Sequence, residues 1–158
     1  MSNVRLSKMI RLLFCASLLT LNGLAYAGAW GEGSFDNDDA LDWVAKCTQV
    51  SDISVVSASI DSALKSEFIE APEGSEAIAA TEVVAAALGK PNPKMPAELK
   101  DWLVNQQTKL LIALTPKARL VLARIKNPKI SELHQLWSEG DANDWLIQVN
   151  EIEDRLGK

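Results

Sequence analysis

The acidic, glycine-rich stretch GAWGEGSFDNDDALDW, residues 28–43, holds the residue types that could bind a phosphate group or a metal ion. A phosphate-binding loop needs glycines between a strand and a helix, followed by a lysine that reaches the anion. This stretch has no such lysine, and its four aspartates would repel a phosphate group. The stretch therefore does not predict a nucleotide-binding loop.

Calcium is the second ligand to consider, because Asp36, Asn37 and Asp38 place side-chain oxygens close together. In an EF-hand the oxygen ligands alternate along the loop and a glycine occupies its sixth position. Counted from Asp36, the fifth residue is Ala40 and the sixth is Leu41, so the pattern fails at both. The dipole of the following helix opposes a cation and favours these carboxylates by about 0.3–1 kcal/mol each. We therefore predict no metal ion and no cofactor here.

The remaining residues with catalytic potential are isolated from one another in the sequence. His134 is the only histidine, and no serine, cysteine or acidic residue lies at a telling spacing from it. Cys47 shares one helical face with Ala40, Trp43 and Val44, which favours a buried thiol over a reactive one. A zinc site needs three or four ligands, which one histidine and one cysteine do not supply. We predict no catalytic residue.

Glu82 lies in the middle of the alanine-rich stretch EAIAATEVVAAALG, residues 76–89, with small or apolar neighbours one turn away. A buried carboxylate needs hydrogen-bond or charged partners. Two interpretations remain open: an exposed carboxylate on a solvated face, or a buried one that accepts hydrogen bonds from the N-terminal segment. In the second case we expect the Trp30 indole, the glycine N–H groups and the Gly28 α-ammonium group to be the donors.

Residues 1–27 have the pattern of a secretory signal peptide. A basic head is followed by the apolar run LLFCASLLTLNGLA and by the small residues Ala25 and Ala27 around Tyr26. A membrane span needs about 20 apolar residues, and Asn22 and Gly23 interrupt a run that is already shorter. We predict cleavage after Ala27, a periplasmic or secreted protein comprising residues 28–158, and no membrane insertion afterwards.

The charge balance argues against nucleic acid as a partner. The chain has 16 basic and 21 acidic residues, for a net charge of −5. The predicted leader contains three of the basic residues and no acid, so its removal would leave a net charge of −8. Such a chain repels a polyanion at long range. Five cations are close in the sequence but scatter around a helix at about 100° per residue; they are Lys117, Arg119, Arg124, Lys126 and Lys129.

Hydrophobic periodicity and capping residues predict an all-α fold, a compact single domain of six to seven short helices in residues 28–158. The expected helices start at Asp36 or Asn37, Ile53, Pro72, Pro96, Thr115, Ser131 and Gly140. Ile53–Phe68 could also be a strand, because ISVVSASI is rich in β-branched residues. We expect the helix that begins at Pro72 to be central, because its alanines let neighbouring helices approach closely. The segment KPNPKMP, residues 90–96, is expected to be a loop.

The opening motif Gly-x-Trp-Gly-x-Gly-x-Phe-Asp-Asn-Asp is met by Gly28, Trp30, Gly31, Gly33, Phe35, Asp36, Asn37 and Asp38. With EAIAATEVVAA, SELHQLW and a closing tryptophan-bearing helix, the chain resembles a bacterial family, the domain of unknown function 4259 family. The resemblance covers essentially all of residues 28–158 and implies a small helical domain, with no activity to carry over. Most members of that family begin at the motif itself without an export signal. This chain departs from that pattern, and cleavage after Ala27 would recreate the usual start.

These features favour a binding protein over an enzyme. The leading hypothesis is an exported module that binds another protein, of the inhibitor or immunity type, with Trp30, Asp36, Asn37, Asp38 and Glu82 as candidate binding residues. The alternative is a carboxylate-based hydrolase or metal-binding protein built from Asp36, Asp38 and Glu82. A third interpretation is that the FDND segment only locks the first helix onto the core. The sequence indicates neither the partner nor the oligomeric state.

Intact-mass spectrometry of the protein isolated from producing cells tests the predicted leader. We expect a chain that begins at Gly28, because the small residues Ala25 and Ala27 fit the signal peptidase. A mass that includes residues 1–27 would contradict both the cleavage and the inferred location.

Overall fold

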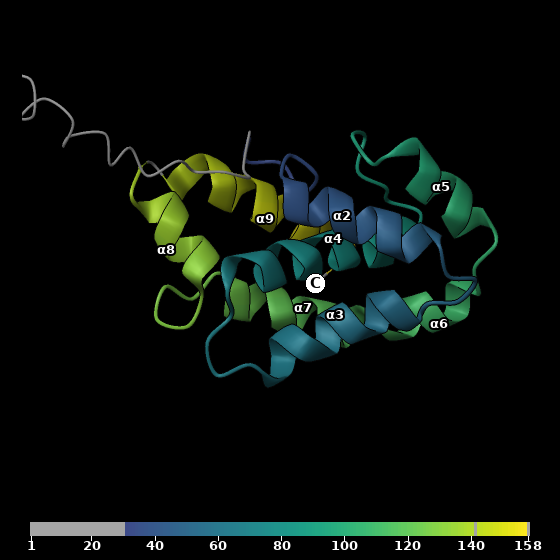
Figure 1. Ribbon diagram of the computed structural model, residues 1–158, viewed down its shortest axis with the longest axis horizontal. Coiled ribbons are helices and arrows are strands. Elements are labelled where there is room, and N and C mark those ends of the chain that lie inside the picture. Colours follow the sequence, from purple (N-terminus) through teal and green to yellow (C-terminus); the bar gives the residue numbers. More distant parts are fainter. Residues whose placement is uncertain (1–30, 141, 158) are drawn as a thin grey trace, which may run out of the picture.

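The computed structural model describes residues 31–140 and 142–157, and these form eight α-helices (Figure 1). The helices are α2 (Asp38–Thr48), α3 (Ser54–Lys65), α4 (Ala71–Ala87), α5 (Ala97–Val104), α6 (Thr108–Ala113), α7 (Thr115–Ile125), α8 (Glu132–Ser138) and α9 (Ala142–Leu156). The all-α prediction is confirmed, with one helix more than the expected maximum of seven. The predicted leader lies outside the described residues. None of the described helices combines the length and apolarity needed to cross a membrane.

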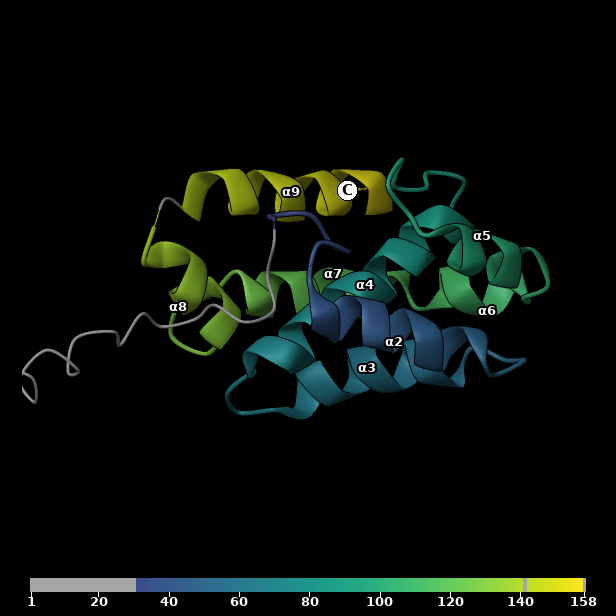
Figure 2. The ribbon, with the colours of Figure 1, turned by 45° about the horizontal axis from the view of Figure 1, so that its top comes forward.

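Helix α4 is the centre of the fold, as its alanine content predicted. It is buried on all sides over most of its length, with every residue from Ala77 to Ala85 buried. Helices α2, α3, α6, α7, α8 and α9 all pack against it, and Figures 1 and 2 show α4 enclosed between them. Small side chains explain this arrangement, because a helix of alanines lets several neighbours approach its backbone at once.

Helix α2 begins and packs as its sequence indicates. The Asn37 side-chain oxygen accepts a hydrogen bond from the Ala40 N–H at 2.8 Å, which caps the helix. The buried face holds Ala40, Trp43, Val44 and Cys47. The Trp43 indole N–H donates to the Ser59 hydroxyl at 2.8 Å, so the buried polar end of this large side chain is satisfied by α3.

The segment that could have been a strand is helix α3. Its side chains Val56, Ile60 and Ala63 are all fully buried, at the three- and four-residue spacing of a helical face. This face packs mainly on α4 and α7. The low helix propensity of a β-branched residue costs a few tenths of a kcal/mol. Burial of its side chain contributes about five times as much free energy to folding. Packing therefore decides the conformation.

Helix α6 was not predicted from the sequence as a separate helix. Residues 90–96 form the expected loop and α5 follows Pro96. Three residues after α5 the chain enters α6, which has six residues and no side-chain cap. A single residue, Leu114, then separates α6 from α7, and its backbone stays in the helical region. An uncapped, short helix with only Leu111 buried gives no periodic signal.

Helices α8 and α9 pack against α4, and α8 also satisfies a backbone donor at the start of α4. The Ser131 hydroxyl accepts a hydrogen bond from the His134 N–H at 3.2 Å and so caps α8, as predicted. The Glu132 carboxylate accepts from the Ala71 N–H at 2.7 Å, which satisfies a free donor at the start of α4. The apolar side chains at helical spacing on α9 are buried, and these are Trp145, Val149, Ile152 and Leu156.

Replacing Ala80 by leucine in the buried middle of α4 tests the central position of this helix. We expect the free energy of unfolding to fall by about 1–3 kcal/mol, because a packed interior has no room for the added carbons. The control is Ala45→Leu on the exposed face of α2, expected to stay within about 0.5 kcal/mol of the original. Equal urea midpoints for the two variants would contradict the packing described here.

Candidate functional site

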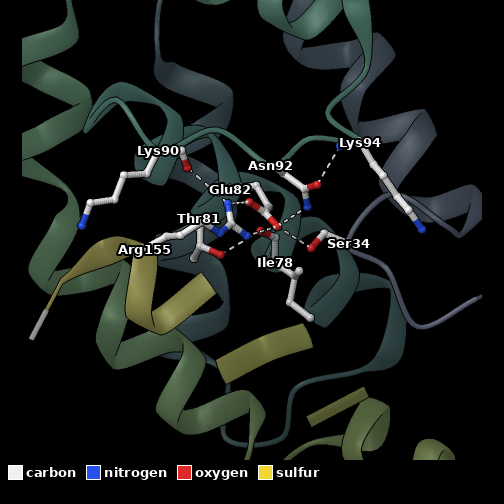
Figure 3. A network of polar contacts seen from close by, with 8 residues as sticks. All are labelled: Ser34, Ile78, Thr81, Glu82, Lys90, Asn92, Lys94 and Arg155. Atoms are coloured by element: carbon white, nitrogen blue, oxygen red, sulfur yellow. Dashed lines mark hydrogen bonds and ion pairs between the residues drawn. The ribbon is translucent and has the colours of Figure 1, made fainter. Parts of the chain in front are cut away.

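The carboxylate of Glu82 is buried and joins four parts of the chain (Figure 3). Its Oε1 atom accepts hydrogen bonds from the Ser34 hydroxyl at 2.7 Å and from the Asn92 amide at 2.7 Å. The Arg155 guanidinium binds both oxygens, with Nη1 at 2.5 Å from Oε2 and Nη2 at 2.8 Å from Oε1. The N-terminal segment, α4, the loop after α4 and the end of α9 therefore meet at one carboxylate.

This geometry decides between the two interpretations of Glu82. The Glu82 side chain is 0% exposed, so the solvated interpretation is wrong. A donor from the N-terminal segment is present, as the second interpretation predicted, but it is Ser34 rather than a group named in advance. Neither Gly31 nor Gly33 donates to Glu82, and Gly28 and Trp30 lie outside the described residues.

The hydrogen bonds around Glu82 fit a structural role better than a catalytic one. Oε1 accepts three hydrogen bonds and Oε2 accepts one, and the whole side chain is buried, so this carboxylate is not exposed to a substrate as a general base would be. The Ser34 hydroxyl donates a hydrogen bond to Glu82, as a serine activated by a base would, but Ser34 is buried. A two-point contact between Arg155 and a carboxylate fixes orientation as well as charge. We interpret the network as a clamp between distant segments.

The glycines of the N-terminal segment make room for a second carboxylate. The Asp36 N–H donates to the Gly33 carbonyl at 3.0 Å, which closes a turn. A Cβ atom on Gly33 would lie 2.4 Å from Asp36 Oδ2, and one on Gly31 would lie 3.0 Å from the same atom. A side chain at position 33 would force the Asp36 carboxylate to move, and one at position 31 would crowd it. The glycine spacing is therefore explained by this turn and needs no phosphate ligand.

The loop after α4 connects the two carboxylates. The Asn92 side chain donates to Glu82 through its amide nitrogen and accepts from the Lys94 N–H at 2.9 Å through its oxygen. The Lys94 ammonium lies 3.7 Å from Asp36 Oδ2. Asn92 thereby fixes the backbone that presents Lys94 to Asp36. Figure 3 shows Asn92 between Lys94 on one side and Glu82 on the other.

The structure does not bring all the predicted binding residues together in one site. Asp36 and Glu82 are linked through the loop, Asn37 caps α2, Asp38 is exposed, and Trp30 lies outside the described residues. Within the described part of the chain, no three His, Cys, Asp or Glu side chains come together as metal ligands. The use of these residues in binding a partner remains a prediction.

Cys47 and His134 occupy structural positions. Cys47 is fully buried, as predicted, and this burial raises the pKa of its thiol to about 12. A thiol that stays protonated is a poor nucleophile. His134 is half-buried, and its ring meets the Trp145 ring edge-on with the ring centres 5.6 Å apart. The His134 Nδ1 atom is buried without a hydrogen-bond partner in the structure described, so nothing there orients it as a base.

A sequence model of the family described as Domain of unknown function (DUF4259) matches residues 28–148, which include the N-terminal motif and helices α2–α8. The chain belongs to the DUF4259 family. This confirms the resemblance seen in the sequence, and the family description carries no activity. No curated protein and no solved structure matches the chain. The DUF4259 match includes Ser34, Glu82 and Asn92 and ends before Arg155.

Sequence reasoning missed Ser34, Asn92, Lys94 and Arg155 of this DUF4259 domain. Asn92 stands between two prolines, which marks a rigid loop but says nothing of the carboxylate it reaches. Arg155 is the basic residue in the last turn of α9, where a cation is favoured by the helix dipole alone. Its pairing with a residue 73 positions away is a property of the tertiary fold.

The clamp is tested by Glu82→Gln, which keeps the size of the side chain and removes its charge. We expect the free energy of unfolding to fall by roughly 3 kcal/mol, because Arg155 would be left in a largely buried place without a counter-charge. The matched control is Glu76→Gln on the same helix. Its exposed pair with Lys46 is worth at most about 1 kcal/mol. An unchanged urea midpoint for Glu82→Gln would rule out the clamp.

Proposed function

We propose that this protein is an exported module that binds another protein through the surface of helices α5, α6 and α7. One observation carries the proposal. Four of the six exposed large apolar side chains of the described residues lie in a stretch of 17 residues. These are Val104 at 84% exposure, Leu120 at 57%, Leu110 at 48% and Ile112 at 38%. We refer to these four side chains as the 104–120 surface.

The distribution of these side chains supports an interface. Single exposed apolar residues are normal on a protein surface, whereas a concentration of them marks an interaction site. Figures 1 and 2 place α5 and α6 at the same end of the molecule, with α7 running from there toward α8. The other two exposed large apolar residues, Phe68 and Ile147, are separate from this group in the sequence.

The polar chemistry of the domain supports recognition over catalysis. The buried carboxylate Glu82 is paired with Arg155, Cys47 is buried, and His134 packs against Trp145. Each of these groups is engaged in holding the fold together. A binding protein needs only a stable surface with suitable side chains, and a rigid scaffold lowers the entropy lost on association.

The N-terminal segment is the second part of the proposal. Asp38 is exposed at the start of α2, so it is accessible to a partner, whereas Asp36 and Asn37 also have internal contacts. The export of the protein rests on the signal-peptide pattern of residues 1–27. We therefore place the partner in the periplasm or outside the cell.

Site-specific photo-crosslinking in the producing cell tests the proposal. A benzophenone amino acid replaces Leu110 in one variant and Leu120 in another, and the control variant carries it at the exposed Ala58 on α3. We expect a protein adduct of the same mass at both test positions and none at the control, because the partner buries the 104–120 surface and leaves this face of α3 exposed. Thermal unfolding confirms that each variant is folded.

The absence of a protein adduct at both Leu110 and Leu120 in folded variants would overturn the proposed function. Adducts of equal yield at the control position would do the same, since they would report random encounters.

A further inference from the structure

We infer that the partner bound by the 104–120 surface presents an acidic segment with apolar side chains; this inference rests on the proposed function. It concerns the chemistry of the partner, which the exposed apolar side chains alone do not define. The argument comes from the distribution of charge along α6 and α7 and from the ion pairs that these helices make.

Residues 104–120 themselves contain no acidic residue, although α5 has Glu98 and Asp101 before Val104. Between Asp101 and Glu132 there are six cations and no aspartate or glutamate, although acids outnumber bases 21 to 16 in the whole chain. The six are Lys109, Lys117, Arg119, Arg124, Lys126 and Lys129. In an acidic protein, an acid-free stretch of this length gives one region of the surface the opposite charge.

Three of these cations are engaged inside the domain. Lys117 pairs with Asp61 of α3 at 2.7 Å, so α3 places one carboxylate beside this surface. Arg124 donates to the backbone carbonyls of Ala63 and Ser66. Lys126 pairs with Glu153 of α9 at 2.6 Å. These contacts hold α7 between α3 and α9 and remove three positive charges from the surface available to a partner.

Lys109 remains available and lies within the apolar group. It is exposed, directly precedes Leu110, and takes part in no ion pair of the described residues. Its nearest acidic neighbour along the chain, Asp101, is one helix earlier. A partner that covers Leu110 and Ile112 must therefore also meet an ammonium group, and a carboxylate on the partner would complement it.

The spacing of the exposed residues suits an elongated partner segment. Ile112, Pro116 and Leu120 are four residues apart, and the break between α6 and α7 is the single residue Leu114. The Ala118 N–H donates to the Leu114 carbonyl at 2.9 Å, so helical hydrogen bonding resumes within one turn. Exposed residues at this spacing lie along one side of the helices, where an amphipathic segment can lie against them.

An anionic membrane offers the same combination of apolar and negative groups, but the charge of the whole protein argues against it. A bilayer is a plane that faces a large part of the molecule, and the net charge of −5 is repelled by it. A protein segment is small enough to contact the acid-free residues 104–120 without facing the rest of the molecule. The observations therefore favour an acidic segment of a protein.

The test combines the crosslinker at Leu110 with reversal of a nearby charge. In the Lys109→Glu variant we expect the adduct yield to fall about fivefold, because a favourable contact becomes a repulsive one. The matched control is Lys65→Glu on α3, an exposed lysine outside the acid-free region, which should leave the yield unchanged. Raising the salt concentration from about 50 mM to about 500 mM should lower the yield of the original protein.

The outcomes separate the two proposals. The inference is supported if the adduct depends on Lys109 and if the crosslinked peptide, sequenced by mass spectrometry, is acidic. An adduct that persists in Lys109→Glu, or a basic crosslinked peptide, overturns the inference and leaves the proposed function standing. Sedimentation of the protein with vesicles of phosphatidylglycerol and phosphatidylethanolamine at roughly 1:3, with no protein adduct, overturns both.

Discussion

The ion pair between Glu82 and Arg155 is the constraint on which the arrangement of the domain depends. A helix that is buried on every side can accommodate a carboxylate only if its charge and its lone pairs are satisfied from neighbouring elements. Helix α4 meets this condition by drawing in Arg155 from α9, Ser34 from the N-terminal segment and Asn92 from the following loop. One acidic residue in the core thus determines where three other segments lie.

The alanine content of α4 and its buried carboxylate are complementary. Small side chains permit close packing of six helices but provide few specific interlocking shapes, since many relative positions of the neighbours bury similar areas. Hydrogen bonds with a defined direction remove this freedom. The bidentate contact of Arg155, the hydroxyl of Ser34 and the amide of Asn92 can be satisfied together in one arrangement only.

Much of this fold could be predicted from the sequence, because its signals are local. The Asn37 and Ser131 caps, the proline at the start of α4 and the periodic apolar residues of α2 and α9 each depend on neighbours within about two turns. Helix α6 lacks such signals. The burial of Glu82 could only be stated as one of two alternatives, and its partners Asn92 and Arg155 were not identified. Pairings over such distances follow from how the helices pack.

The distance along the chain between Ser34 and Arg155 has a consequence for the order of events during synthesis. Ser34 leaves the ribosome before α4, whereas the guanidinium that balances Glu82 is made 73 positions after it. Until then α4 would contain an unbalanced charge in its apolar surroundings, which discourages premature compaction.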